Sequence, residues 1–177
     1  MAFRYAGRLQ RKVDVNRCIK IALVHDLAEA VVGDIHVFDS QTIQAKKIKQ
    51  ESEYIGIKKI QSLLNDPDGD ELFAYWEEYE EQTSDEGRFI KALDKLEVFI
   101  QHMEADLSTW EEREKRMLFQ EKWLKRYCAW DPFLLSFCEA VLEAGIAKLR
   151  AGGENIARIQ KEALVETSLW AACEETV

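Results

Sequence analysis

The sequence predicts an all-α fold, and three observations lead to this expectation. Helix-forming Glu, Lys, Ala and Leu are abundant, whereas the 177 residues include only two prolines and eight glycines. Apolar residues recur every three or four positions, and no segment of useful length alternates as a strand does. The hydrophobic fraction of 47% is ordinary for a globular protein of this length, which can bury a core without disulfides or structural metals.

The expected helices follow in order from the apolar spacing and from capping residues. Residues 1–10 have an amphipathic pattern with no cap ahead of them, which indicates a first helix whose beginning is missing. The second helix, 15–32, is apolar nearly all round, as a central buried helix is; Asp14 caps it and Gly33 ends it. Further helices are expected at residues 40–64, 71–81, 84–103, 110–127, 132–151 and 154–172.

Two caps and one charged cluster belong to this helical plan. Ser40 is placed to cap the third helix, and Thr83 with Glu86 resembles a capping box for the fifth. The lysine-rich residues 46–49 are expected on a solvated helix face, although the same charge could border an anionic substrate.

Net charge and cysteine content limit the classes of partner and the cellular compartment. The net charge of −9 lacks the positive footprint of a general nucleic-acid binder, although a metal ion could still bring positive charge to a small phosphorylated substrate. There is no CxxC pair and no apolar run that suits a membrane span or a signal peptide. We therefore expect buried reduced thiols, no nucleic-acid partner, no membrane association and a cytoplasmic protein. The cysteines are Cys18, Cys128, Cys138 and Cys173.

The candidate chemistry concentrates in the second helix. His25 and Glu29 are four residues apart and share a face, and Asp26 is one step round. Ionisable groups in an apolar helix are costly unless they are paired or bind a metal, so a divalent-cation site and a salt-bridged polar patch are both open interpretations. Asp94, in the fifth helix, is typical of a solvated acid when taken alone, and together with the His-Asp pair it is a candidate third ligand.

These residues carry a resemblance to a known family. The run 21–35, with the pattern HD-x-x-E-x-x-x-GD, closely resembles the central motif of HD-domain metal-dependent phosphohydrolases, and of their 5′-deoxynucleotidase branch in particular. Residues 89–97 resemble the second motif of that family, and the acidic, aromatic residues 75–80 lie between them at the usual spacing. The resemblance covers residues 1–150 as an HD domain and leaves residues 151–177 as a C-terminal helical extension.

The resemblance implies a helical bundle around a single divalent metal ion, held by four ligands in the order His, His, Asp, Asp. His25 and Asp26 match the middle pair, and Asp94 matches the last ligand. Glu29 matches the acid near the metal-bound water, and Asp34 matches a second acid that faces the substrate. The ion could be Mn, Co, Fe, Zn or Mg, because mixed histidine and carboxylate ligation suits several metals.

The implied activity is phosphoric monoester hydrolysis by a homodimer. A (deoxy)nucleoside 5′-monophosphate would be cleaved to a nucleoside and phosphate, with the ion lowering the pKa of bound water. Two alternatives stay open. One is a non-catalytic, HD-derived helical binding module, and the other is an HD hydrolase of another phosphorylated metabolite.

One departure from the family concerns the first histidine. In the family this ligand lies just ahead of a segment that resembles residues 1–6, a position that this chain does not contain. We expect either a chain that begins late or a site with three protein ligands, which would bind metal weakly and show little activity. Neither remaining histidine is expected to replace it: His36 is typical of a solvated loop residue and His102, two turns past Asp94, of a helix-packing or surface residue.

Overall fold

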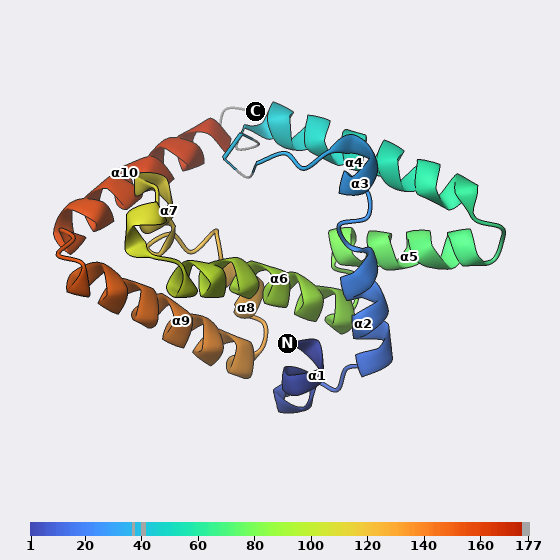
Figure 1. Cartoon of the computed structure of the whole chain (residues 1–177), viewed down its shortest axis with the longest axis horizontal. Helices are drawn as coiled ribbons and strands as arrows, with labels where there is room; N and C mark the ends of the chain where they lie inside the picture. Colours follow the sequence, from blue (N-terminus) through green and yellow to red (C-terminus); the bar gives the residue numbers. More distant parts are fainter. Residues whose placement is uncertain (37, 40–41, 175–177) are drawn as a thin grey trace. The chain divides into compact units, whose positions relative to one another are not determined.

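The computed structural model describes residues 1–36, 38–39 and 42–174, with side chains as far as residue 168. Within these residues every regular element is helical, which confirms the all-α prediction (Figure 1). No helix in this part of the chain combines the length and the apolar character that a membrane span needs. The elements are α1 (Ala2–Tyr5), η1 (Ala6–Arg8), α2 (Val15–Val24), α3 (Glu29–Val32), α4 (Ile43–Leu63), α5 (Asp68–Glu81), α6 (Asp85–Glu104), η2 (Leu107–Thr109), α7 (Glu112–Met117), α8 (Lys125–Cys128), α9 (Pro132–Ala151) and α10 (Ile156–Glu174).

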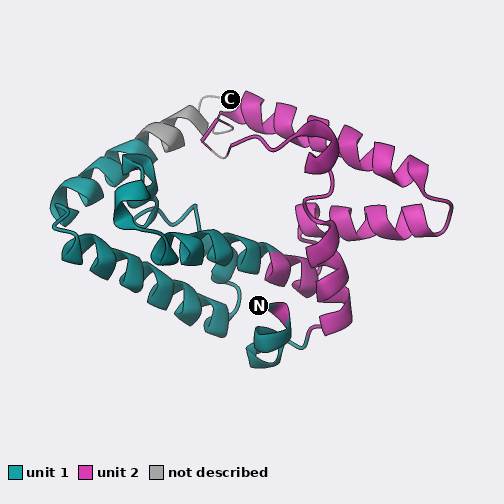
Figure 2. Ribbon diagram, in the orientation of Figure 1, with its two compact units in different colours: residues 1, 3–12, 91–177 teal, residues 2, 13–90 magenta. Residues whose placement is uncertain are grey.

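The chain forms two compact units, which Figure 2 shows in different colours. Helix α6 contributes residues to both of them. The expected division into an HD domain over residues 1–150 and an extension over residues 151–177 rests on the family resemblance and stays a prediction. Unit 2 contains Ala2 and Val13–Ile90, and unit 1 contains Met1, Phe3–Lys12 and the chain from Lys91 onward.

Unit 2 is built on the hairpin of α4 and α5, with α2 packed on α5 and α3 packed on α4 (Figure 1). Its core is an apolar cluster in which Ala28, Ile57 and Trp76 are buried. Gly56 lets α4 approach closely, because a Cβ at this position would lie 2.8 Å from the carbonyl oxygen of Ala28. This contact holds the backbone between α2 and α3, where the His-Asp pair lies, against α4.

The predicted helix 15–32 is interrupted in the structure. Residues 25–28 form tight turns between α2 and α3. The backbone N–H groups of Leu27 and Glu29 donate to the carbonyl oxygens three residues earlier, at 3.0 Å each. The prediction of one continuous helix was wrong because three-residue and four-residue turns place apolar side chains on similar faces, so the spacing does not separate them.

Several helix ends agree with the sequence prediction. Asp14 caps α2 by accepting the backbone N–H two residues on, at 2.9 Å, and Gly33, with φ +83°, ends α3. Helix α9 spans residues 132–151 as predicted. The predicted cap Ser40 lies outside the described residues, and Thr42 caps α4 in the structure.

Other predicted elements were wrong. Ser84 caps α6, because its Oγ accepts the backbone N–H three residues on at 2.9 Å, in place of the predicted box of Thr83 and Glu86. The Glu86 carboxylate instead accepts the backbone N–H of the residue that caps α2, at 2.8 Å. Residues 110–127 divide into α7 and α8, and residues 1–10 contain only the short α1 and η1. Such contacts and breaks depend on tertiary packing, which local propensity does not report.

In unit 1, α10 packs on α7 and α9, and α8 packs on α9. The buried Asp131 side chain caps α9 and also accepts the backbone N–H of Gln10 at 2.8 Å, which ties the N-terminal segment to this helix. The side chain of Cys173 lies outside the described residues. The other cysteines are buried free thiols, as predicted: Cys18, Cys128 and Cys138.

Candidate functional site

The predicted His-Asp pair lies in the turn between α2 and α3. His25 Nδ1 is 2.8 Å from the carbonyl oxygen of Ala22, so we assign the ring proton to Nδ1, which donates it there. Nε2 of His25 is 3.0 Å from Oδ2 of Asp26. In a neutral imidazole with this tautomer Nε2 is an acceptor, and two acceptors at this distance repel each other unless a proton or a cation lies between them.

The chemistry of this pair fits a divalent cation. At metal sites a histidine usually donates its second ring N–H to a carbonyl or carboxylate oxygen, which fixes the tautomer and aims the other nitrogen at the ion. Asp26 adds a carboxylate oxygen and a negative charge. Tyr79 of α5, only 3% exposed, packs edge-on against the His25 ring with centroids 4.9 Å apart, so the ring orientation is held on both sides.

An ion pair between a buried glutamate and an exposed arginine holds α5 in place. Glu78 is 6% exposed and accepts hydrogen bonds from Nε of Arg17 on α2, at 2.9 Å, and from the Ser84 hydroxyl. Burial raises the pKa of Glu78, but these hydrogen bonds outweigh burial, so the pKa lies below the ordinary value. The pair therefore fixes α5, and Tyr79 with it, against the helix that leads into the His-Asp turn.

The two predicted catalytic acids share one cation. Nζ of Lys49 on α4 lies 3.3 Å from Oε1 of Glu29 and 3.9 Å from Oδ1 of Asp34. Burial and the nearby Asp26 and Asp34 charges raise the pKa of Glu29, and Lys49 opposes this rise. A carboxylate whose pKa is raised is better suited than an ordinary one to take up and release a proton near neutral pH.

Lys49 is the site residue that sequence reasoning missed. Residues 46–49 were expected on a solvated face, which describes Lys47, at 75% exposed, but not Lys49, at 27% exposed. Lys49, Glu53 and Gly56 follow one another at i, i+4 and i+7, and so share one face of α4. This spacing is the signal that could have separated Lys49 from its neighbours.

The structure therefore brings His25 to Asp26, and both Glu29 and Asp34 to Lys49, whereas Asp94 lies on α6 in unit 1. The half-buried carboxylate of Asp94 is 2.9 Å from Nζ of its neighbour, Lys95. Among the described residues, no three or more His, Cys, Asp or Glu side chains form a group that could hold a metal ion. The assignment of Asp94 as a third protein ligand stays a prediction.

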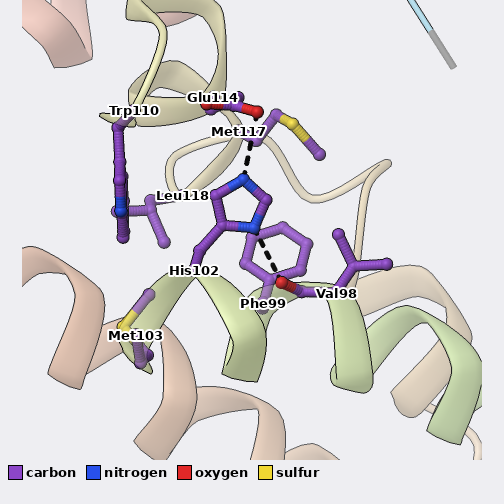
Figure 3. A pocket seen from close by; sticks show the side chains of 8 residues that line it. All are labelled: Val98, Phe99, His102, Met103, Trp110, Glu114, Met117 and Leu118. Atoms are coloured by element: carbon purple, nitrogen blue, oxygen red, sulfur yellow. Dashed lines mark hydrogen bonds and ion pairs between the residues drawn. The ribbon is translucent and has the colours of Figure 1, made fainter. Parts of the chain in front are cut away.

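The two other histidines have partners of their own. His36 is exposed after α3, and its Nδ1 accepts a backbone N–H two residues on at 3.4 Å. His102 on α6 donates from Nδ1 to the carbonyl oxygen of Val98 at 2.7 Å, and its Nε2 is 3.1 Å from Oε1 of Glu114 on α7 (Figure 3). The Trp110 ring packs edge-on against it, 5.3 Å between centroids. The cavity here is about 10 Å³, space for one water. The predictions of a loop residue and a helix-packing residue are confirmed.

Comparison with known proteins identifies similar chains. A protein-family profile described as "HD domain" matches residues 1–129. The chain is 42% identical to 5′-deoxynucleotidase HDDC2 of Xenopus laevis over 60% of this chain and 49% of that protein. It is 40% identical to 5′-deoxynucleotidase HDDC2 of Homo sapiens over 54% and 45%, and 40% identical to 5′-deoxynucleotidase YGK1 of Saccharomyces cerevisiae over 54% and 45%. The chain spans about half the length of these relatives.

The fold is also found in solved structures. One of them is a crystal structure described as a "predicted metal-dependent phosphohydrolase" from Magnetospirillum magnetotacticum. The TM-score is 0.67, with 22% sequence identity, and the match covers 84% of this chain and 72% of the other. At this level of identity the likeness concerns the arrangement of the helices.

Proposed function

Because this chain belongs to the HD-domain family, we propose that it is a metal-dependent phosphohydrolase of nucleoside 5′-monophosphates, and of deoxynucleotides in particular. The products are a nucleoside and inorganic phosphate. One observation carries the proposal: Nε2 of His25 faces a carboxylate oxygen of Asp26 at 3.0 Å while Nδ1 is already hydrogen-bonded. Relatives 40% and 42% identical that are named 5′-deoxynucleotidase support the substrate class.

The proposed cofactor is one divalent metal ion. His25 and Asp26 would hold it, with Asp94 as the third protein ligand. When bound, the ion would lower the pKa of a coordinated water molecule and polarise a phosphoryl oxygen. Mixed imidazole and carboxylate ligation suits Mn, Co, Fe, Zn and Mg, so the identity of the ion has to be determined by adding each metal in turn.

The proposed catalytic acids are Glu29 and Asp34. Glu29 orients the attacking water and takes its proton, a role that its raised pKa supports. Asp34, largely exposed at the end of α3, assists the departing 5′-oxygen or binds near the sugar. Tyr79 keeps the His25 ring aimed, which makes it a positioning residue.

The direct test is the release of inorganic phosphate from a panel of ribo- and deoxyribonucleoside 5′-monophosphates, with each of the five metals added in turn. We expect slow release, because the family's first histidine ligand is missing from this chain, and release that depends on the metal and is fastest with deoxynucleotides. Variants H25A and D26A should show none, while K47M, changed at an exposed position of α4, should match the unaltered protein.

Two other outcomes would point to the alternatives. No release with any metal, from this chain and from a version extended upstream to include the family's first histidine, would overturn the enzyme proposal and favour an HD-derived binding module. Release only from phosphorylated compounds that are not nucleotides would retain the chemistry and replace the substrate class.

We also propose a homodimer in the cytoplasm that binds neither nucleic acid nor membrane. The buried free thiols Cys18, Cys128 and Cys138 support a reducing compartment, and the net charge of −9 argues against nucleic-acid binding. The dimer rests on the family resemblance alone. Analytical ultracentrifugation tests it, and a single sedimenting species of about 20.5 kDa would contradict it.

A further inference from the structure

Three carboxylates from different segments converge on one ammonium group in unit 2. Nζ of Lys49 lies 3.0 Å from Oε1 of Glu53, 3.3 Å from Oε1 of Glu29 and 3.9 Å from Oδ1 of Asp34. Glu53 is on α4 with Lys49, Glu29 begins α3, and Asp34 follows it. Glu53 is 13% exposed, Glu29 25% and Lys49 27%, so water screens these three groups less than it screens a surface ion pair, whereas Asp34 is 71% exposed.

Packing sets the position of Lys49. Gly56, two turns further along the same face of α4, lies against the backbone at Ala28. Glu53, one turn from Lys49, anchors the ammonium group by an i,i+4 ion pair. The lysine is therefore held over α3 by its own helix, and its hydrogen bond to Glu29 fixes the direction of that carboxylate.

A divalent ion at the His-Asp pair would compete with Lys49 for Glu29. Asp26 and Glu29 are separated by one helical turn, and their charges interact. Hard divalent cations readily add carboxylate oxygens to their ligand set. A Glu29 carboxylate bound directly to the ion would no longer be available to orient a water molecule or accept its proton.

We propose that Lys49 is a positioning residue that keeps Glu29 out of the ligand set of an ion bound at His25 and Asp26. Glu29 then remains available to the attacking water. This assignment rests on the proposed function for its catalytic consequence, and on the ion pairs of Lys49 for its geometry.

A purely structural ion pair makes a different prediction. If Lys49 only stabilised the packing of α3 on α4, its removal would loosen the site, and metal affinity and turnover would fall together. If Lys49 restrains Glu29, its removal strengthens metal binding, because a carboxylate is released towards the ion, and weakens turnover. The two measurements then move in opposite directions.

The experiment compares K49M with K49R, which keeps the charge, and with K47M as the control on the same helix. Calorimetric titration with Mn²⁺ in the absence of substrate measures metal affinity, and phosphate release from a deoxynucleotide measures kcat and KM. We expect K49M to bind Mn²⁺ about 3- to 10-fold more tightly. Its kcat should fall by about tenfold or more with little change in KM. K49R should restore both values, and K47M should change neither.

A double variant isolates the part played by Glu29. The tighter Mn²⁺ binding of K49M should disappear in K49M/E29A, because the released carboxylate is gone. Tightening that persists without Glu29 would overturn the proposal, as would a K49M protein with unchanged or weakened Mn²⁺ binding. Where K49M fails to fold, K49Q, which retains polarity without the charge, replaces it with the same expected signs.

The outcomes separate this inference from the proposed function. Mn²⁺ binding without phosphate release from any nucleotide would overturn the proposed function. The titrations of K49M and K49M/E29A would still test whether Lys49 keeps Glu29 away from the ion. A protein that binds no Mn²⁺ would overturn this role of Lys49 directly, since there would be no ion for Glu29 to join.

Discussion

Gly56 on α4 lies against the carbonyl oxygen of Ala28, the last residue of the turn that carries the His-Asp pair. A Cβ at position 56 would be 2.8 Å from this oxygen and 3.2 Å from Cγ1 of Val32. A backbone oxygen has little freedom to move away, so only glycine permits this approach of α4 to α3. The same approach places Lys49 next to Glu29.

We expect G56A to lower the free energy of unfolding by about 1–3 kcal/mol, because the added methyl group forces α4 away from the turn. Urea denaturation measures this loss. The control is G7A, at a glycine where an added Cβ has no neighbour within 4 Å, and its effect should stay within about 0.5 kcal/mol. Equal stability of G56A and the unaltered protein would show that α4 can move away from the turn with no loss of unfolding free energy.

Asp26 and Glu29 should respond differently to substitution. D26A removes a proposed ligand and should abolish Mn²⁺ binding in a calorimetric titration. E29A should leave that binding in place and lower kcat by about 10²- to 10⁴-fold, the usual contribution of a general base. Equal loss of Mn²⁺ binding in both variants would make Glu29 a ligand and contradict the role assigned to it.

Glu78 should make stability depend on pH in one direction. Hydrogen bonds from Arg17 and Ser84 outweigh burial and hold its pKa below the ordinary glutamate value of about 4.3. Ionised Glu78 therefore stabilises the fold above that pH, and this contribution is lost as the pH falls through the folded-state pKa.

The corresponding measurement is urea denaturation of the unaltered protein and of E78Q between pH 3 and 7. E78Q should be less stable by about 1–3 kcal/mol at neutral pH, and the difference should shrink in acid. E77Q, at an exposed position of the same helix, should show no such pH-dependent difference. A gap between the unaltered protein and E78Q that is constant across this range would contradict the assignment.

His102 should matter for stability and not for the metal. Its ring joins the Val98 carbonyl to the Glu114 carboxylate, so H102A should cost about 1–2 kcal/mol of unfolding free energy. Mn²⁺ affinity should remain unchanged in H102A and be lost in H25A. Matching losses of affinity in the two variants would identify His102 as the ligand that replaces the family's first histidine.

The sequence was sufficient for the parts of the site that depend on neighbours in the chain. His25 and Asp26 are adjacent, Glu29 follows within one turn, and Gly33 precedes Asp34, so a helical reading already groups them. Asp131 and Pro132 mark the start of α9 by local rules that the structure follows.

Features that depend on tertiary packing could not be predicted in this way. Lys49 reaches Glu29 across 20 positions because Gly56 brings two helices together, and the Glu86 carboxylate meets the Asp14 N–H across 72 positions. The break at residues 25–28 escaped detection for another reason. Its hydrogen bonds join each backbone N–H to the carbonyl oxygen three residues earlier, and they leave the apolar pattern of a continuous helix nearly unchanged.

As the proposed metal ligands, His25 and Asp26 would form a chelate from two consecutive residues, which the turn between α2 and α3 brings together. Their donor atoms are 3.0 Å apart although consecutive residues on a helical backbone project in different directions. Once one donor holds an ion, the tether of a few covalent bonds gives the other a high effective concentration. Capture of the ion would then require little long-range order, and ligands from elsewhere in the protein would act on the affinity and on the choice of metal.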